Sequence, residues 1–212
     1  MKEDTGEDVL KVKLDPPQTS GGGQIWEIIK NRRSVRSFAG RPVSKDELSN
    51  LLWATQGITA RHRNFSFRAA PSASALYPIE TYLVVNRMQG LEPGIYHYEI
   101  ESHSLAQLKK GDFSYVANQA AFNQETMGAA DMIFVWSAIF ARSKWKYKER
   151  AYRYIYIEAG HIAQNLALAA IALGLGSCPV GAFDDGEVNN LLGLDGIDES
   201  VVYTTAIGRP RT

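Results

Sequence analysis

The stretch RAYRYIYIEAGHIAQNLALAAIAL, residues 150–173, decides the fold. Its apolar side chains recur at intervals of three and four residues, which predicts one long helix. Beyond Gln164 the pattern is apolar on every side, so we expect this helix to lie at the centre of the molecule. The other elements of the chain must then pack around it.

Shorter segments on both sides of this helix predict strands and small helices. The predicted helices cover 26–31, 44–56 and 184–192, and the second opens with a capping box in which Ser44 precedes Glu47 by three residues. The predicted strands are 81–88, 94–100, 105–108, 132–140 and 201–207, and residues 102–104 form a hairpin turn. Helices and strands alternate irregularly, which favours an α+β fold over a doubly wound sheet.

Composition and charge exclude several classes of protein. The 212 residues include 23 Lys and Arg and 23 Asp and Glu, so the formal net charge is zero and no field attracts nucleic acid or anionic lipid. The single cysteine, Cys178, excludes an intrachain disulfide and fits a reducing cytoplasm. The N-terminus lacks a secretory signal, and the longest apolar run, 166–176, is shorter than the roughly 18–20 residues that span a membrane.

The chain divides into an arm and one domain. Residues 1–23 contain an alternating stretch, VLKVKL at 9–14, and then Pro16-Pro17 and a glycine-rich run, which is linker chemistry. From residue 24 to 212 no repeat or long low-complexity segment interrupts the sequence. We therefore expect a single domain at 24–212 behind an N-terminal arm.

The segment RRSVRSF at 32–38 is a candidate anion site. If the chain is extended there, a period of two places Arg32, Ser34 and Arg36 on one side. Two guanidinium groups and a hydroxyl would then converge on one anion, and phosphate suits such a fork. The alternative is a solvated basic end of the preceding helix.

Two segments of small residues could approach a flat ligand. PSASALYPIE at 71–80 leads into a strand, and an ordinary strand-entry loop would look much the same. Residues 174–185, GLGSCPVGAFDD, form a small-residue link between the long helix and the next helix. This link lacks the glycine motifs of dinucleotide-binding folds and P-loops. We expect Gly174 and Gly176 to end the helix. Gly181-Ala182 could offer backbone N–H groups to a ligand.

Basic and aromatic residues alternate in the segment 144–154, KWKYKERAYRY. The net charge of zero argues against binding of single-stranded nucleic acid by this segment. The segment is then either the solvated start of a helix or the site of an acid/base pair, Lys146-Tyr147. The four histidines show no metal-ligand spacing, and we expect no metal site.

Taken in order, these segments resemble the flavin-dependent nitroreductase family, and within it the SagB-type dehydrogenase branch. The match runs from about Ile25 to Pro210. It is carried by RRSVRSF, PSASALYPIE, PGIYHYEIESHSL at 93–105, YIEAGHIAQNLALAAIALGLGS at 156–177, PVGAFDD at 179–185 and IGRP at 207–210.

The resemblance implies a homodimer of α+β subunits, each with a central, mostly antiparallel sheet and helices around a long buried helix. FMN would lie at the dimer interface, and NAD(P)H would be the electron donor. The flavin phosphate and ribityl chain would contact the two basic motifs, and the ring would contact the loop of the other subunit and the segment facing the hydride-accepting nitrogen. The residues implied in FMN binding are Arg32, Arg33, Ser34, Arg36, Pro71, Ser72, Ala73, Ser74, Gly181, Ala182, Gly208 and Arg209.

Two departures from the common nitroreductase pattern separate the functional hypotheses. Gly181-Ala182 stands where the family has Glu-Gly, so the ring contact would be purely backbone. Lys146-Tyr147 aligns with the catalytic pair of azoline oxidases, which classical nitroreductases lack.

The first hypothesis is a ping-pong reductase that passes a hydride from NAD(P)H through flavin to a small nitroarene or quinone. The second is a SagB-type oxidase of peptide thiazolines or oxazolines. The third is a flavin-binding scaffold without turnover.

Overall fold

The computed structural model describes residues 9–39, 41–63 and 65–211. At its centre lies α6 (Ala151–Ala172), the long helix expected from the sequence. Its side chains Ile155, Ile162 and Leu166 are buried in one core with Phe134 and Trp136 of the sheet. The prediction of a central, buried helix is therefore confirmed.

The main sheet has seven strands in the order β1-β6-β5-β4-β7-β9-β8. Every neighbouring pair in it is antiparallel. The strands are β1 (Lys11–Lys13), β4 (Ile79–Val85), β5 (Gly94–Glu99), β6 (Ser104–Lys110), β7 (Met132–Ile139), β8 (Gly176–Val180) and β9 (Glu199–Gly208). This sheet with its flanking helices confirms the predicted α+β class and its antiparallel character.

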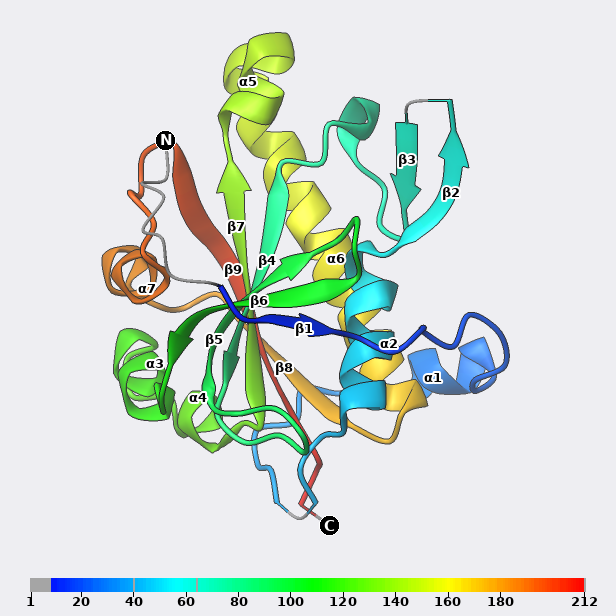
Figure 1. Ribbon diagram of the computed structural model, residues 1–212, viewed down its shortest axis with the longest axis vertical. Helices are drawn as coiled ribbons and strands as arrows, with labels where there is room; N and C mark the ends of the chain where they lie inside the picture. The colour runs from blue at the N-terminus through cyan, green and yellow to red at the C-terminus, as the bar shows by residue number, and fades with distance from the viewer. Residues whose placement is uncertain (1–8, 40, 64, 212) are drawn as a thin grey trace.

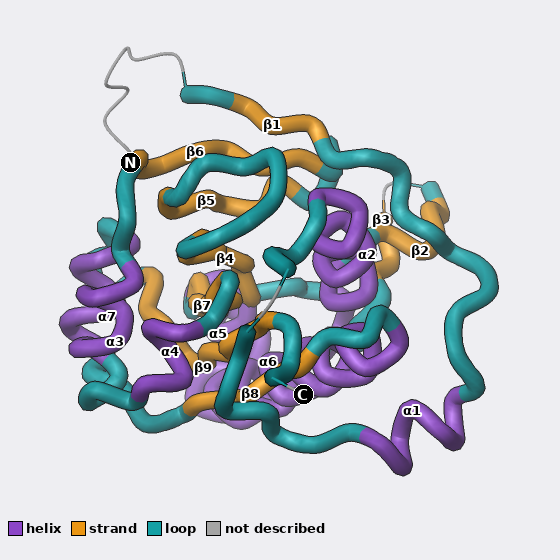
Figure 2. The backbone as a smooth tube through the Cα atoms, turned by 90° about the horizontal axis from the view of Figure 1, so that it is seen from below, coloured by secondary structure: helices purple, strands orange, loops and turns teal. Residues whose placement is uncertain are grey.

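Helices cover both faces of this sheet (Figure 1). On one face lie α6 and α2 (Lys45–Gln56), which pack against each other. On the other lie α3 (Ser114–Ala120), α4 (Glu125–Ala129) and α7 (Asp185–Leu192). Figure 2 shows the sheet between these two groups of helices.

The remaining elements lie at the periphery. A small hairpin of β2 (Ile58–His62) and β3 (Phe65–Arg68) is separate from the main sheet. A short 3-10 helix, η1 (Ala73–Ala75), precedes β4. Another, η2 (Lys148–Arg150), joins α5 (Ala141–Tyr147) to α6, and α1 (Ile25–Asn31) stands at the edge of the molecule in both figures.

Several local predictions are confirmed. The Ser44 hydroxyl accepts the Glu47 N–H at 3.2 Å while the Glu47 carboxylate accepts the Ser44 N–H at 2.8 Å, so the capping box is present. The basic aromatic run 144–154 does include the start of a helix, but it also covers the end of α5 and all of η2.

Two segments differ from their predicted form. Residues 176–180, expected to be part of a link, form β8 at the edge of the sheet, where Pro179 is tolerated because an edge strand does not need every N–H. Within the expected arm, residues 11–13 form β1, which pairs with β6 at the opposite edge. The sequence of β8 is poor in β-branched residues and carries little strand signal. The alternation at 9–14 is itself a strand signal, but the proline and glycine run after it favoured an arm.

Candidate functional site

Segments from both ends of the chain meet where β9 finishes. The Val35 N–H donates to the Ser177 carbonyl at 2.9 Å, and the Ala39 N–H donates to the Arg209 carbonyl at 2.9 Å. Ser34 forms a parallel bridge with Ser177. The 34–39 segment is thus extended, as the fork hypothesis requires, and lies beside β8 and the chain that follows β9.

Two glycines allow this close approach. A Cβ on Gly176 would lie 2.8 Å from the Cβ of Val35, and one on Gly208 would lie 2.9 Å from Cγ of Phe38. Any larger residue would push the 34–38 segment away from the sheet. The helix itself ends at Gly174, whose φ is +69°. Gly176 therefore serves the contact with Val35 and not the end of the helix.

Arg209 is oriented by a residue that sequence reasoning assigned only to a helix cap. Its Nη2 donates to the Glu47 carboxylate at 2.7 Å and its Nε to the Arg41 carbonyl at 3.3 Å. Burial acts to raise the pKa of Glu47, but hydrogen bonds from Ser44 and Arg209 together bring it below its usual value. Within the described residues, Nη1 of Arg209 has no hydrogen bond and can receive an anion.

The other basic residues near this position behave differently from one another. Arg33 turns back and donates to the Lys30 and Arg32 carbonyls at 2.7 and 2.8 Å, so it caps the end of α1 and does not join the fork. Arg36 is exposed and lies near enough to Cys178 for its charge to lower the pKa of that thiol, which burial raises overall. The structure thus brings Ser34, Arg36 and Arg209 to one end of the sheet, with Arg32 at the adjoining helix end.

Gly181 and Ala182 follow β8 directly and are exposed. Neither of their backbone N–H groups makes a hydrogen bond within the part of the chain that the structure describes. The Ala182 carbonyl accepts from the Gln124 side chain at 2.8 Å, which fixes the segment. Two small residues with free donors are therefore held at the end of an edge strand, as a ligand ring would require.

The loop 71–74 and the Lys146-Tyr147 pair, expected from separate motifs, lie in contact. Lys146 Nζ donates to Ser74 Oγ at 2.7 Å, and Ser74 Oγ shares a hydrogen bond with the Tyr147 hydroxyl at 2.5 Å. Ser74 itself has a φ of +56°, an uncommon conformation for a residue with a side chain. The loop conformation and the helix end are thus coupled through one serine.

Behind this loop lies a carboxyl group that sequence reasoning missed. Glu158 of α6 is only 3% exposed, and its Oε1 has no hydrogen-bond partner among the described residues. Burial raises the pKa of Glu158 to about 7, against smaller opposing effects of the Ser72 hydroxyl and the Arg68 charge. In the sequence, Glu158 stands three residues after Ile155 and four before Ile162, so the helical spacing does place it on the buried face.

These two groups of residues lie at opposite ends of the molecule. Ile139 pairs with Glu199 at the start of β9, immediately before α5, whereas Arg209 follows the end of β9. Because β9 has ten residues, its ends are about 30 Å apart at roughly 3.3 Å per residue. Figure 1 places α5 and the C-terminus at opposite ends of the view.

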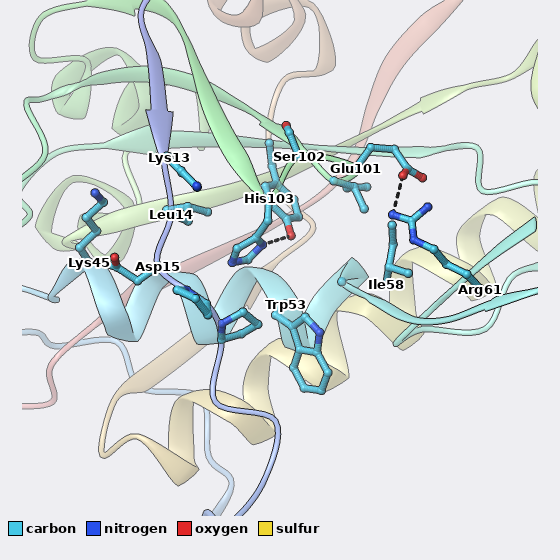
Figure 3. A pocket seen from close by; sticks show the side chains of 15 residues that line it. Lys13, Leu14, Asp15, Lys45, Trp53, Ile58, Arg61, Glu101, Ser102 and His103 are labelled. Atoms are coloured by element: carbon cyan, nitrogen blue, oxygen red, sulfur yellow. Dashed lines mark hydrogen bonds and ion pairs between the residues drawn. The ribbon is translucent and has the colours of Figure 1, made fainter.

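A separate hollow of about 770 Å³ lies between residues 13–17, α2, β2 and the turn from β5 to β6 (Figure 3). None of the predicted flavin-site residues lines it. At its wall the Ser49 hydroxyl donates to the Asp15 carbonyl at 2.6 Å, so it accepts from Nε2 of His103 at 2.8 Å. The Tyr98 hydroxyl then donates to Nδ1 at 2.7 Å. This chain of bonds accounts for every proton and ties the N-terminal segment to the fold.

The comparisons with known proteins agree with the architecture. A model of the nitroreductase family matches residues 29–209. A nitroreductase-type protein of Methanocaldococcus jannaschii is 36% identical over 169 residues, which are 80% of this chain and 84% of that protein. The trifolitoxin-processing protein TfxB of Rhizobium leguminosarum bv. trifolii is 33% identical over 67% of this chain and 39% of its own length.

Among solved structures, a nitroreductase-type protein of Anabaena variabilis superposes with a TM-score of 0.82 at 33% identity. It covers 96% of this chain, but this chain spans only 42% of its length. The chain belongs to the nitroreductase family, whose members are oxidoreductases. Two further findings hold for the described residues: none of their helices could cross a membrane, and they contain no cluster of three metal-ligating side chains.

Proposed function

We propose that the chain is an FMN-dependent oxidoreductase that passes a hydride from NAD(P)H to a small electron-poor acceptor such as a nitroarene or quinone. The observation that carries this proposal is the strip formed by residues 34–36, β8 and Arg209, which has cations at one end and free N–H groups at the other. A ligand with an anionic end and a flat ring suits such a strip.

The residues present fit FMN. Nη1 of Arg209 and the exposed Arg36 would bind its phosphate, and Ser34 would contact the chain between phosphate and ring. The N–H groups of Gly181 and Ala182 would face the ring edge. When bound, FMN supplies the hydride chemistry, while the protein supplies position and electrostatics.

The first test is retention of FMN. Replacing Arg209 with Ala removes a charge-assisted contact, so we expect FMN binding to weaken by about 1.5–3 kcal/mol, roughly tenfold to 150-fold. Mass spectrometry of the released ligand and titration by flavin fluorescence measure this. Arg61→Ala is the matched control, because Arg61 pairs with Glu101 at the separate hollow. Equal affinity of both variants would refute the phosphate assignment.

We also propose that a second copy of the chain completes the site. A flavin bound at Arg209 is too short to reach the loop 71–74 about 30 Å away along the same chain. In addition, no residue of α1 is buried, and Trp26 on it is 79% exposed. On the neighbouring α6, Tyr156 and Ile157 are exposed. Exposed apolar side chains on both helices suit a partner chain, which would bring its own loop to the ring.

A second candidate function is the oxidation of a thiazoline or oxazoline in a peptide. The contact of Lys146 and Tyr147 through Ser74 favours it, since either group, once it has lost its own proton, can take a proton from the substrate, and Ser74 links the two. The relative TfxB is named as a trifolitoxin-processing protein.

Lys146→Met separates the two candidates. We expect it to lower oxidation of a thiazoline-containing peptide at least a hundredfold, because the acid/base pair of Lys146 and Tyr147 is lost. We expect it to leave nitroarene reduction within about twofold. Lys144→Met is the control, since that lysine lies on the same helix but contacts Tyr152. Equal losses of both activities in Lys146→Met would refute the assigned role. A wild-type protein that binds FMN but catalyses neither nitroarene reduction nor thiazoline oxidation would favour the third hypothesis, a flavin-binding scaffold without turnover.

A further inference from the structure

A second hollow, of about 500 Å³, lies between the end of β3, the start of β4, the turn from β5 to β6 and the start of α5. Two arginines line it: Arg68, the last residue of β3, and Arg142, in the first turn of α5. Both contact Tyr77, because Arg68 stacks over its ring at 4.4 Å and Nη1 of Arg142 donates to its carbonyl at 3.2 Å. Tyr77 thus holds two guanidinium groups at one hollow.

Arg68 is a half-buried cation without a carboxylate partner among the described residues. Its Nη1 donates to the neutral Gln56 Oε1 at 2.8 Å, while its Nε and Nη2 have no partner there and are not sealed from the surface. Glu80 and Glu158 act on its charge from beyond ion-pair distance, but burial outweighs them and lowers the pKa of Arg68. A desolvated cation in this state is stabilised by an anion that reaches it.

The carboxylates that line the hollow do not compensate Arg68, because each has a cation of its own. The ion pairs are Glu80 with Arg142, Glu99 with Lys11 and Glu101 with Arg61. Counting Arg68, four Lys and Arg side chains stand against three Glu side chains in this group, so one positive charge is left over. The hollow therefore favours an anionic ligand over a neutral one.

Arg142 is held in place by contacts that leave part of its guanidinium free. Its Nη1 donates to Glu80 Oε1 and to the Tyr77 carbonyl, and its Nε and Nη2 have no partner in the described part of the chain. The other oxygen of Glu80 is hydrogen-bonded to Nε2 of His97 at 2.6 Å, so both oxygens are engaged within the protein. The free edge of a guanidinium matches the two oxygens of a carboxylate.

We propose that this hollow binds the carboxylate of an organic acid between Arg68 and Arg142. The organic part would lie against the apolar lining side chains of Leu76 and Ile100. Leu76 directly follows η1, in the loop that would receive the flavin ring of the partner chain, so the hollow would select a carboxylate-bearing acceptor. This selection rests on the proposed function, whereas the binding of the carboxylate does not.

The first test compares two small molecules of nearly the same shape, para-nitrobenzoate and para-nitrobenzamide, of which only the first is charged. Their affinities for the purified full chain are measured by isothermal titration calorimetry. We expect the wild type to bind para-nitrobenzoate at least about tenfold more tightly, because the neutral amide cannot form charge-assisted bonds to the guanidinium groups. Equal affinities for the two compounds would overturn the proposal.

The second test removes the unpaired cation. In Arg68→Gln we expect the preference for para-nitrobenzoate to fall to about twofold or less. Arg63→Gln is the matched control, because it removes the same charge from an exposed position next to β2, outside the hollow, and should leave the preference unchanged. If Arg68→Gln does not fold, Arg142→Gln makes the same test from α5. A preference that persists in the folded variant would place the carboxylate elsewhere and refute the site.

Reduction kinetics separate this inference from the proposed function. With both correct, KM should be about tenfold lower for para-nitrobenzoate than for para-nitrobenzamide, and Arg68→Gln should raise the KM for para-nitrobenzoate with little change in kcat. A wild type that binds para-nitrobenzoate but reduces neither compound would refute the proposed function and leave the carboxylate site standing. Reduction of both compounds with equal KM would refute the selection of acceptors.

Discussion

Mixing two variants that each fail to bind FMN should restore binding at about a quarter of the sites. One variant carries Arg36→Ala and Arg209→Ala and loses the phosphate contacts; the other carries Ala73→Tyr, which places a bulky side chain on the ring loop. The double arginine variant loses two charge-assisted contacts, about 3–6 kcal/mol of binding free energy together, so its own sites are empty. If phosphate and loop come from different chains, each mixed dimer contains one intact site and one doubly defective site.

The fraction follows from random pairing. Equal mixing and exchange of chains make half of the dimers mixed, and half of the sites in those dimers are intact. FMN bound per chain, measured by absorbance after unfolding and refolding the mixture, should thus reach about 0.25 of the wild-type value.

A reciprocal control distinguishes the alternative. A chain with all three substitutions, mixed equally with wild type, should also leave a quarter of the sites, because only wild-type pairs are intact. If each site lay within one chain, the first mixture would bind no FMN and the second would fill half of its sites. That pair of results would refute the shared site.

The sequence predicts the elements whose signals are local. The helix 151–172 has a long apolar repeat, and α2 begins with a capping box, so both are found nearly to the residue. The edge strand β8 was missed because Gly176, Ser177 and Pro179 have no strand propensity, and its existence depends on pairing with β9.

The site shows the same division. The motifs containing Arg36, Arg209, Ser74 and Lys146 stand out as sequences, but their grouping does not. Ser74 meets Lys146 across 72 residues, and Glu47 meets Arg209 across 162. The spacing between Ile155 and Ile162 places Glu158 on the inward face of the helix, but the sequence does not reveal that its Oε1 has no partner among the described residues.

Glu158→Gln should stabilise the flavin-free protein at alkaline pH by about 2–3 kcal/mol more than it does at pH 5. In the folded protein burial raises the pKa of Glu158 to about 7, whereas in the unfolded chain it stays near its ordinary 4.5. Between these values the unfolded chain has released the proton that the folded chain still binds, so wild-type stability falls as pH rises from 4.5 to 7 and then levels off. The difference of about 2.5 pKa units corresponds to roughly 3 kcal/mol.

Urea unfolding of wild type and Glu158→Gln at pH 5 and pH 8, at one protein concentration, measures this effect. The comparison between the two proteins cancels other titrating groups, including His103, whose pKa burial lowers. Glu149→Gln, at an exposed position before α6, should show a stability difference that does not change with pH. Because the penalty arises inside the folded chain, it must appear without FMN. A Glu158→Gln difference that is the same at both pH values would mean that Glu158 ionises in the folded protein as freely as in the unfolded one, and the partnerless oxygen would then have found water.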